Sequence, residues 1–214
     1  FDLLTRETPS KERALFIQSK ILRRVVPSFL WWWWWGVVVV VFLLVDRGVL
    51  AMRLVLQRVK SAKVTVDQEV VSSIGPGVLA LVGLHQHDTE EDLAFCCKRL
   101  LAAKLWENDN GGMWRHGVKQ KGFPILCVSQ FTLYGTLSKK FQPDYKLSMK
   151  AIPAKALYDQ FLTMLKEAYQ EDKIFDGVFG AMMDVELVND GPVTIIIESE
   201  PKSPPPPPPP QETT

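Results

Sequence analysis

The chain has 214 residues, of which 47% are hydrophobic and 23% charged, and its formal net charge is +1. These values are ordinary for a globular protein. They exclude a protein that grips nucleic acid along its whole length through a strong positive field. If RNA binds, it must do so through a local patch and a shaped pocket.

The first 51 residues differ in composition from the rest of the chain. Val25–Val45 is an uncharged run that would span roughly 31 Å as a helix, enough to cross a bilayer. The tandem tracts Trp31–Trp35 and Val37–Val41 favour another explanation, because tryptophan has one codon and five identical triplets must encode the first tract. We interpret residues 1–51 as a leader or gene-model extension outside the fold, with a membrane anchor at 25–45 as the alternative.

Residues 52–200 carry a regular pattern that predicts a single α+β domain, a mainly antiparallel or mixed β-sheet covered by two helices. About 149 residues are enough for one stable core. The expected strands are 54–59, 62–66, 70–74, 78–84, 104–107, 123–134, 181–188 and 193–197, and the expected helices begin near 88–91 and at Pro153. The first four strands are expected to form an antiparallel meander.

Each expected helix carries one apolar stripe at helical spacing. The stripes are Leu93, Cys96, Cys97, Leu100 and Leu101 in the first helix, and Leu157, Phe161, Leu165 and Ala168 in the second. With Cys127, the two stripe cysteines are the only thiols, and no CxxC pair suggests zinc. We expect three buried, reduced thiols and no metal.

Seven consecutive prolines, Pro204–Pro210, lie in the segment 201–214. Such a tract adopts polyproline II and cannot join a helix or sheet. We expect a solvated, disordered tail, with binding to a profilin-, SH3- or WW-type partner as the alternative.

A polar string, Ser129–Leu133, comes directly after an apolar strand and is the first site candidate. Ser129 and Thr132 offer hydroxyls and Gln130 an amide, close to backbone N–H groups at a strand end. Backbone amides aimed at a developing oxyanion stabilise a transition state without an ionisable group. Taken alone, the string also fits a strand whose hydroxyls merely satisfy nearby backbone groups.

A second string, Asn189–Thr194, contains the step Gly191–Pro192 between two strand-like runs. Proline tolerates a preceding cis bond, and glycine permits close backbone approach. The step can therefore point backbone carbonyls where no side chain reaches, although a plain turn fits the sequence as well.

Histidine-driven catalysis is not expected. None of the three histidines, His85, His87 and His116, lies in either string, and there is no GxSxG motif. His85 and His87 could approach a metal, but no third ligand is near, and we expect both in a solvent-exposed loop.

Taken in order, four segments resemble the D-aminoacyl-tRNA deacylase family. They are Met52–Val59, Ser129–Leu133, Phe179–Met182 and the Asn189-x-Gly191-Pro192-Val193-Thr194 string. The resemblance runs from Met52 to about Ser199, marks 52–200 as the deacylase domain and supports Met52 as its natural start.

The resemblance implies a cytoplasmic homodimer without a cofactor that hydrolyses the ester between a D-amino acid and the 3′ end of tRNA, and that clears mischarged glycyl-tRNA. In that family the Gly-Pro step is cis and enters the other subunit's site. Here Gly191 and Pro192 would capture the substrate amino group and exclude an L side chain. The pocket residues implied are Ser129, Gln130, Phe131 and Thr132, with Phe179, Ala181 and Met182 as its wall.

Two roles for Thr132 stay open: a nucleophile, or part of a pocket that positions water while the tRNA's 2′-OH assists. We favour the second, because no base is evident for Thr132. The basic loop 139–144 could contact the acceptor stem. Other functions that the sequence allows are a non-catalytic module that binds tRNA ends and a membrane-anchored protein that uses 25–45 and the proline tail.

Overall fold

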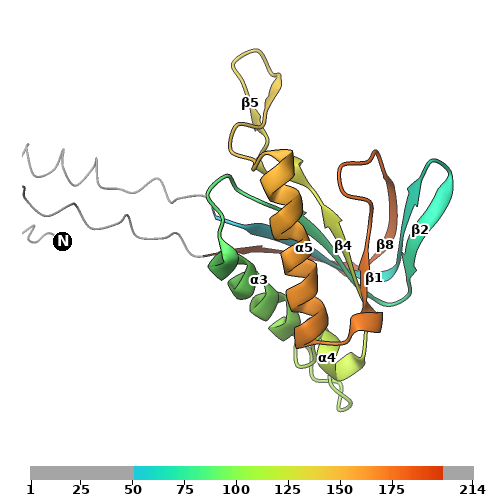
Figure 1. Cartoon of the computed structure of the whole chain (residues 1–214). Coiled ribbons are helices and arrows are strands. Elements are labelled where there is room, and N and C mark those ends of the chain that lie inside the picture. The colour runs from blue at the N-terminus through green and yellow to red at the C-terminus, as the bar shows by residue number, and fades with distance from the viewer. Residues whose placement is uncertain (1–50, 200–214) are drawn as a thin grey trace, which may run out of the picture. The chain divides into compact units, whose positions relative to one another are not determined.

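The structure, a computed structural model, describes residues 51–199 (Figure 1). The expectations for 25–45 and 201–214, and all but the last residue of the expected leader, lie outside these residues. Within residues 51–199, no helix is long and apolar enough to cross a membrane. The strands are β1 (Arg53–Val66), β2 (Glu69–Ile74), β3 (Gly77–Gly83), β4 (Ile125–Ser129), β5 (Thr136–Leu137), β6 (Pro143–Asp144), β7 (Ile174–Asp176) and β8 (Asp184–Glu198). The helices are α3 (Glu90–Ala102), α4 (Val118–Lys121) and α5 (Ala151–Ala168), with 3₁₀ helices η1 (Phe131–Tyr134) and η2 (Glu171–Lys173).

The main sheet is mixed, which confirms the expected α+β class. Strand β1 pairs along its length with β8, antiparallel, while β3 and then β4 and β7 extend the sheet on its other side. The β3–β4 and β4–β7 pairs are parallel. The expected meander is wrong in one respect: β3 pairs with the first half of β1 and not with β2, which pairs with the second half. The 14-residue length of β1 gives both strands room.

Helices α3 and α5 lie together on one face of this sheet (Figure 1). Helix α3 begins after Thr89, whose side chain forms a capping box with Asp92. All five stripe residues expected in α3 are buried, as predicted. In α5, Phe161 and Leu165 are buried, but Ala168 is exposed and Tyr158 points inward instead.

The face of the sheet opposite the helices is covered by residues of β1 and β2, which belong to the same sheet. Val64 of β1 and Ile74 of β2 pack with Leu79, Leu126 and Val128 in a second core cluster. The Ser72 hydroxyl of β2 donates a hydrogen bond to the carbonyl of Asp176 in β7, which joins strands that are not sheet neighbours. The β1–β2 end therefore curls back over the sheet, so that one layer of helices is enough to complete the core.

Five expected element boundaries are wrong. The two strands expected at 54–59 and 62–66 are the single strand β1. The strand expected at 123–134 ends at Ser129 and continues as η1, and 104–107 contains only an isolated bridge between Trp106 and His116. Helix α5 begins at Ala151, so that Pro153 lies in its first turn, where its missing N–H costs no hydrogen bond. The two strands expected at 181–197 are one strand, β8, interrupted by a bulge.

The three cysteines are buried and free, as expected. Burial raises the pKa of the Cys96 thiol to about 12. Burial also raises the pKa of Cys97 and of Cys127 above the usual range. The thiols therefore serve as small apolar side chains within the core.

Candidate functional site

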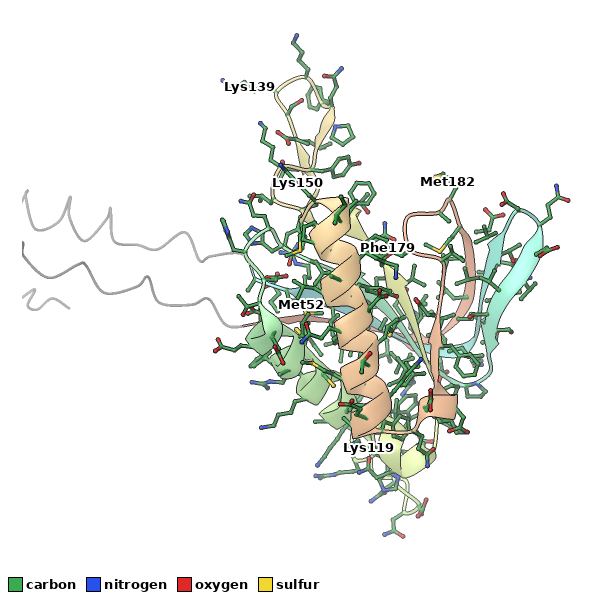
Figure 2. All side chains as sticks on the ribbon, viewed as in Figure 1. Met52, Lys119, Lys139, Lys150, Phe179 and Met182 are labelled. Carbon is green, nitrogen blue, oxygen red and sulfur yellow. The ribbon has the colours of Figure 1, made fainter. Side chains whose placement is uncertain are left out.

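A pocket of about 810 Å³ opens beside the end of β4, next to the start of α5. Its wall comes from four segments that are distant in sequence. The lining residues are Val82, Leu84, Val128, Ser129, Gln130, Phe131, Thr132, Tyr145, Ser148, Met149, Lys150, Ala151, Ala154, Phe179, Gly180, Ala181, Met182, Met183 and Val185. Figure 2 shows Lys150, Phe179 and Met182 around this end of the molecule.

The segment after β4 gives the pocket its polar side. The backbone N–H of Gln130 still donates to the carbonyl of Val82 at 2.8 Å, and the chain then turns out of the sheet into η1. A helix leaves its first N–H groups without partners inside the helix. Within residues 51–199 the N–H groups of Phe131 and Thr132 donate to no backbone carbonyl outside η1. Both residues line the pocket.

The side chains of this segment are held by their neighbours. Gln130 Nε2 donates a hydrogen bond to the Thr132 hydroxyl oxygen, which leaves the hydroxyl hydrogen free to donate. The carbonyl of Phe131 accepts a hydrogen bond from Ser148 Oγ at 2.7 Å. The ring of Phe131 meets Tyr145 edge to face, with ring centroids 4.9 Å apart.

The opposite wall rests on a partly buried polar pair, Tyr158 and Asp176. Phe179 packs against Tyr158 of α5 with ring centroids 5.6 Å apart. The Tyr158 hydroxyl donates to a carboxylate oxygen of Asp176, at the end of β7. Burial raises the pKa of Asp176, and the bond from Tyr158 opposes that rise. At the rim Met182 is 93% exposed, which leaves an apolar side chain beside the opening.

Acids, histidines and cysteines are absent from the described lining of the pocket, whose only ionisable side chains are Lys150 and Tyr145. His85 does not lie in an exposed loop as expected: it is 3% exposed and packs against Tyr134, with ring centroids 5.4 Å apart. Burial and the neighbouring His87 lower the pKa of His85. Within residues 51–199, no three potential ligands come together as a metal site.

Gly191 and Pro192 are exposed on the surface, outside the pocket formed by the same chain. On β8, Asn189 pairs with Val59 and Thr194 with Gln57, so the residues between them form a bulge. Asn189 Oδ1 accepts a hydrogen bond from the N–H of Val193 at 2.9 Å and closes this bulge. The Gly191–Pro192 bond is cis. Neither residue lines the pocket formed by the same chain.

Arg58 of β1 holds the bulge in place. Its guanidinium lies 3.1 Å from the Asp190 carboxylate and donates through Nε to the Asp190 carbonyl at 3.2 Å. Nη1 donates to the carbonyl of Leu105 at 2.5 Å. The guanidinium carbon lies 5.8 Å from the centre of the Trp114 ring. The arginine thus fastens the Gly-Pro bulge to the segment after α3.

The structure brings seven of the nine predicted site residues to one pocket, and only Gly191 and Pro192 lie outside it. Sequence reasoning missed Tyr145, Ser148, Met149 and Lys150, which form the wall before α5. The basic loop 139–144 was noted, but no motif extended that observation to the residues after it.

Residues 55–198 match the sequence model of a family described as D-Tyr-tRNA(Tyr) deacylase. The chain belongs to this family. A D-aminoacyl-tRNA deacylase of Drosophila melanogaster is 51% identical over 148 residues, which cover 69% of this chain and 92% of the relative. A D-aminoacyl-tRNA deacylase of Dictyostelium discoideum is 45% identical, over 71% of this chain and 100% of the relative. The resemblance noted in the sequence is therefore confirmed.

Two solved structures share the deacylase family's fold with this chain. One, described as a c-Myc DNA Unwinding Element Binding Protein, has a TM-score of 0.66 and 41% identity, over 69% of this chain and 98% of that one. The other, described as a probable eukaryotic D-amino acid tRNA deacylase, has a TM-score of 0.61 and 17% identity, over 70% of this chain and 100% of that one. The second supports the fold alone.

Proposed function

We propose that this protein hydrolyses the ester of D-aminoacyl-tRNA and of mischarged glycyl-tRNA, and releases the free amino acid and tRNA. The observation that carries the proposal is the pocket itself. In a chain that belongs to the deacylase family, residues 129–132 and 179–182 meet around one cavity although about fifty residues separate them. The cavity offers backbone donors and a mainly apolar wall, which suits a neutral ester attached to a nucleoside.

The chemistry rests on positioning and charge stabilisation. The N–H groups of Phe131 and Thr132 donate to the carbonyl oxygen as it becomes an oxyanion, while Ser129 and Gln130 orient the terminal adenosine and the ester. A water, assisted by the tRNA 2′-OH, attacks the carbonyl carbon, and the bond to the ribose oxygen breaks. Thr132 donates its hydroxyl hydrogen and is not the nucleophile, because neither a carboxylate nor an imidazole lines the described pocket to activate it.

The chiral filter is shared between two copies of the chain. Gly191 and Pro192 of one protomer enter the pocket of its partner, where their carbonyls hold the substrate amino group and leave no space for an L side chain. Two features support a dimer: the bulge lies outside its own pocket, and β8 has β1 as its sole strand partner among the described residues. Val188, Ile195 and Ile196 are exposed on this edge strand. We place the dimer in the cytoplasm.

The deciding experiment compares D-tyrosyl-tRNA, L-tyrosyl-tRNA and glycyl-tRNA with the same enzyme preparation. Release of amino acid from the first and third, with the second stable, is the expected result. Equal release from D- and L-tyrosyl-tRNA would contradict the proposed chiral filter. Tight binding of tRNA without release from any substrate would instead identify a module that binds tRNA ends.

A further inference from the structure

A basic arm projects from the pocket wall, and the proposed hydrolysis does not use it. We define the basic arm as residues 136–150, which comprise the β5–β6 hairpin and the segment that leads into α5. Figure 1 shows the hairpin extending beyond the end of α5, and Figure 2 places Lys139 near its tip and Lys150 at its base. The tip is closed by backbone hydrogen bonds between Ser138 and Gln142 and between Phe141 and Ser138.

Charge on the basic arm is strongly one-sided. It contains four lysines and a single acid, Asp144, which pairs with Lys146 at 2.7 Å. Among residues 51–199, no acidic side chain forms an ion pair with the other three lysines, Lys139, Lys140 and Lys150. The protein as a whole carries a net charge of only +1, so this positive patch is local.

An aromatic side chain stands at the tip of the basic arm. Phe141 is 84% exposed and sits beside Lys140, and it adopts a left-handed backbone conformation with φ of 59°. That conformation disfavours a bulky L residue, and glycine would adopt it at no steric cost. An exposed ring in such a position gains nothing from the core. It does provide a flat face on which a base can stack.

The base of the basic arm belongs to the pocket. Tyr145, Ser148 and Lys150 line the cavity, and Ser148 Oγ holds the Phe131 carbonyl. The backbone is fixed from the other side, since Met149 N–H donates to the Leu84 carbonyl at 2.9 Å. A ligand whose end lies in the pocket can therefore continue along a surface that is rigidly joined to it.

We propose that the basic arm binds the RNA next to the aminoacylated end, with Lys139, Lys140 and Lys150 on phosphates and Phe141 stacked on a base. The inference rests on the proposed function, which puts the 3′ terminus in the pocket. From Gly135 to Lys139 an extended strand covers about 13 Å. This corresponds to roughly four nucleotides of a stacked strand at about 3.4 Å each. The arm thus reads the backbone and bases close to the terminus, and the pocket reads the ester.

The test separates the RNA body from the ester by comparing D-tyrosyl-tRNA with 3′-D-tyrosyl-adenosine, which carries the same ester without the rest of the RNA. For Lys139→Ala/Lys140→Ala we expect a loss of about tenfold in kcat/KM on the tRNA, mainly through KM. The slope of log affinity against log salt should become shallower by about 1 to 2. Hydrolysis of the adenosine ester should stay within about twofold.

Three matched variants sharpen the comparison. Lys98→Ala/Lys166→Ala removes the same charge from exposed positions on α3 and α5 and should change neither substrate by more than about twofold. Phe141→Leu keeps bulk without the aromatic face and should weaken the tRNA reaction about fivefold or more, while Phe141→Tyr should retain it. Thermal unfolding of each variant checks that the fold is intact.

Equal losses on tRNA and on the adenosine ester, or no loss on tRNA, would overturn the proposal. A change in molar mass by sedimentation for the arm variants would overturn it too, and would assign the arm to contacts between proteins. If neither ester is hydrolysed by the unaltered protein, the proposed function fails by itself. Direct binding of uncharged tRNA to the same variants then decides the role of the arm.

Discussion

At the scale of single residues, the proposed chemistry depends on main-chain groups more than on ionisable side chains. The described pocket lining contains no carboxylate or imidazole, and in the proposed function the N–H groups of Phe131 and Thr132 donate to the ester carbonyl. An aminoacyl ester is an activated substrate, so orientation and oxyanion stabilisation are sufficient to accelerate its hydrolysis.

Replacement of Thr132 by alanine tests this view of catalysis. The variant removes one hydroxyl and the acceptor of Gln130 Nε2 but leaves the backbone N–H donors unchanged. We expect Thr132→Ala to retain at least about a tenth of kcat on D-tyrosyl-tRNA. Loss of a true nucleophile lowers kcat by about 10⁴-fold or more. Single-turnover kinetics with a folded, tRNA-binding variant make the distinction, and a drop of that size would restore Thr132 as the nucleophile.

Gly191 tolerates no side chain. Its φ is +125°, and an added Cβ would lie 2.7 Å from Val193 Cγ2 and 3.3 Å from Arg58 Nη2. We expect Gly191→Ala to reduce D-tyrosyl-tRNA hydrolysis at least about tenfold and to lower the free energy of unfolding by about 1–3 kcal/mol. Gly75→Ala is the matched control, because nothing lies within 4 Å of its added Cβ. Similar activity in both variants would contradict the role given to Gly191.

At the scale of elements, two irregular segments carry the residues that are proposed to act on the substrate. The turn from β4 into η1 carries residues 130–132 out of the sheet, and the bulge in β8 pushes Gly191 and Pro192 away from β1. Both irregularities are fastened by long-range hydrogen bonds: Gln130 N–H reaches β3, and Arg58 of β1 reaches Asp190. Regular strands support both segments, and the two irregularities carry the residues with proposed functional roles.

Arg58 is the residue whose loss we expect to weaken the attachment of the β8 bulge most. It is 8% exposed and joins the bulge of β8 to the carbonyl of Leu105. We expect Arg58→Ala to lower the free energy of unfolding by about 2–3 kcal/mol, because the partners of a buried guanidinium would be left unsatisfied. Urea denaturation measures this change.

A conservative substitution provides the control for Arg58. Arg58→Lys keeps the charge but cannot make both contacts at once, so it should fall between wild type and alanine. If Arg58→Lys and Arg58→Ala lower the free energy of unfolding equally, the simultaneous contact with Asp190 and Leu105 is essential. No change in either variant would show that the bulge is held by other contacts.

At the scale of the whole molecule, one layer of helices and a curled sheet make a core that contains every described thiol. Cys96 and Cys97 face the sheet from α3, and Cys127 lies within β4. Burial raises the pKa of all three, because a thiolate loses its hydration there. Because of these cysteines, the free energy of unfolding is expected to decrease as pH rises into the alkaline range.

We expect stability to fall as pH rises above about 9. The Cys96 pKa is about 12 in the folded chain against an ordinary 9.0, so the folded state holds this proton in the window between them while the unfolded state loses it. Each such thiol lowers the free energy of unfolding by up to about 1.4 kcal/mol per pH unit. Urea midpoints at pH 7, 9 and 10.5 test this, and Ellman's reagent at pH 8 should react slowly before unfolding. A midpoint that is constant from pH 7 to 10.5 would contradict the prediction.

The sequence by itself determined the fold class and the buried face of α3, and its resemblance to the deacylase family indicated seven residues of one pocket. Apolar spacing selects the buried face of α3, whereas the pocket residues follow from the resemblance of the segments 129–133 and 179–182 to the deacylase family. The burial of Cys96 and Cys97 was predictable from the same periodicity, and that of Cys127 from the apolar run around it.

Only the tertiary structure decided where these segments meet. Nothing local distinguishes a strand that ends at Ser129 from one that runs to Tyr134, since the turn depends on the bond from Gln130 to Val82. His85 is polar and was expected in solvent, but packing against Tyr134 buries it. Likewise β8 continues through Gly191 because β1 is long enough to pair on both sides of the bulge. Long-range pairing fixes these features, and no window of neighbouring residues contains it.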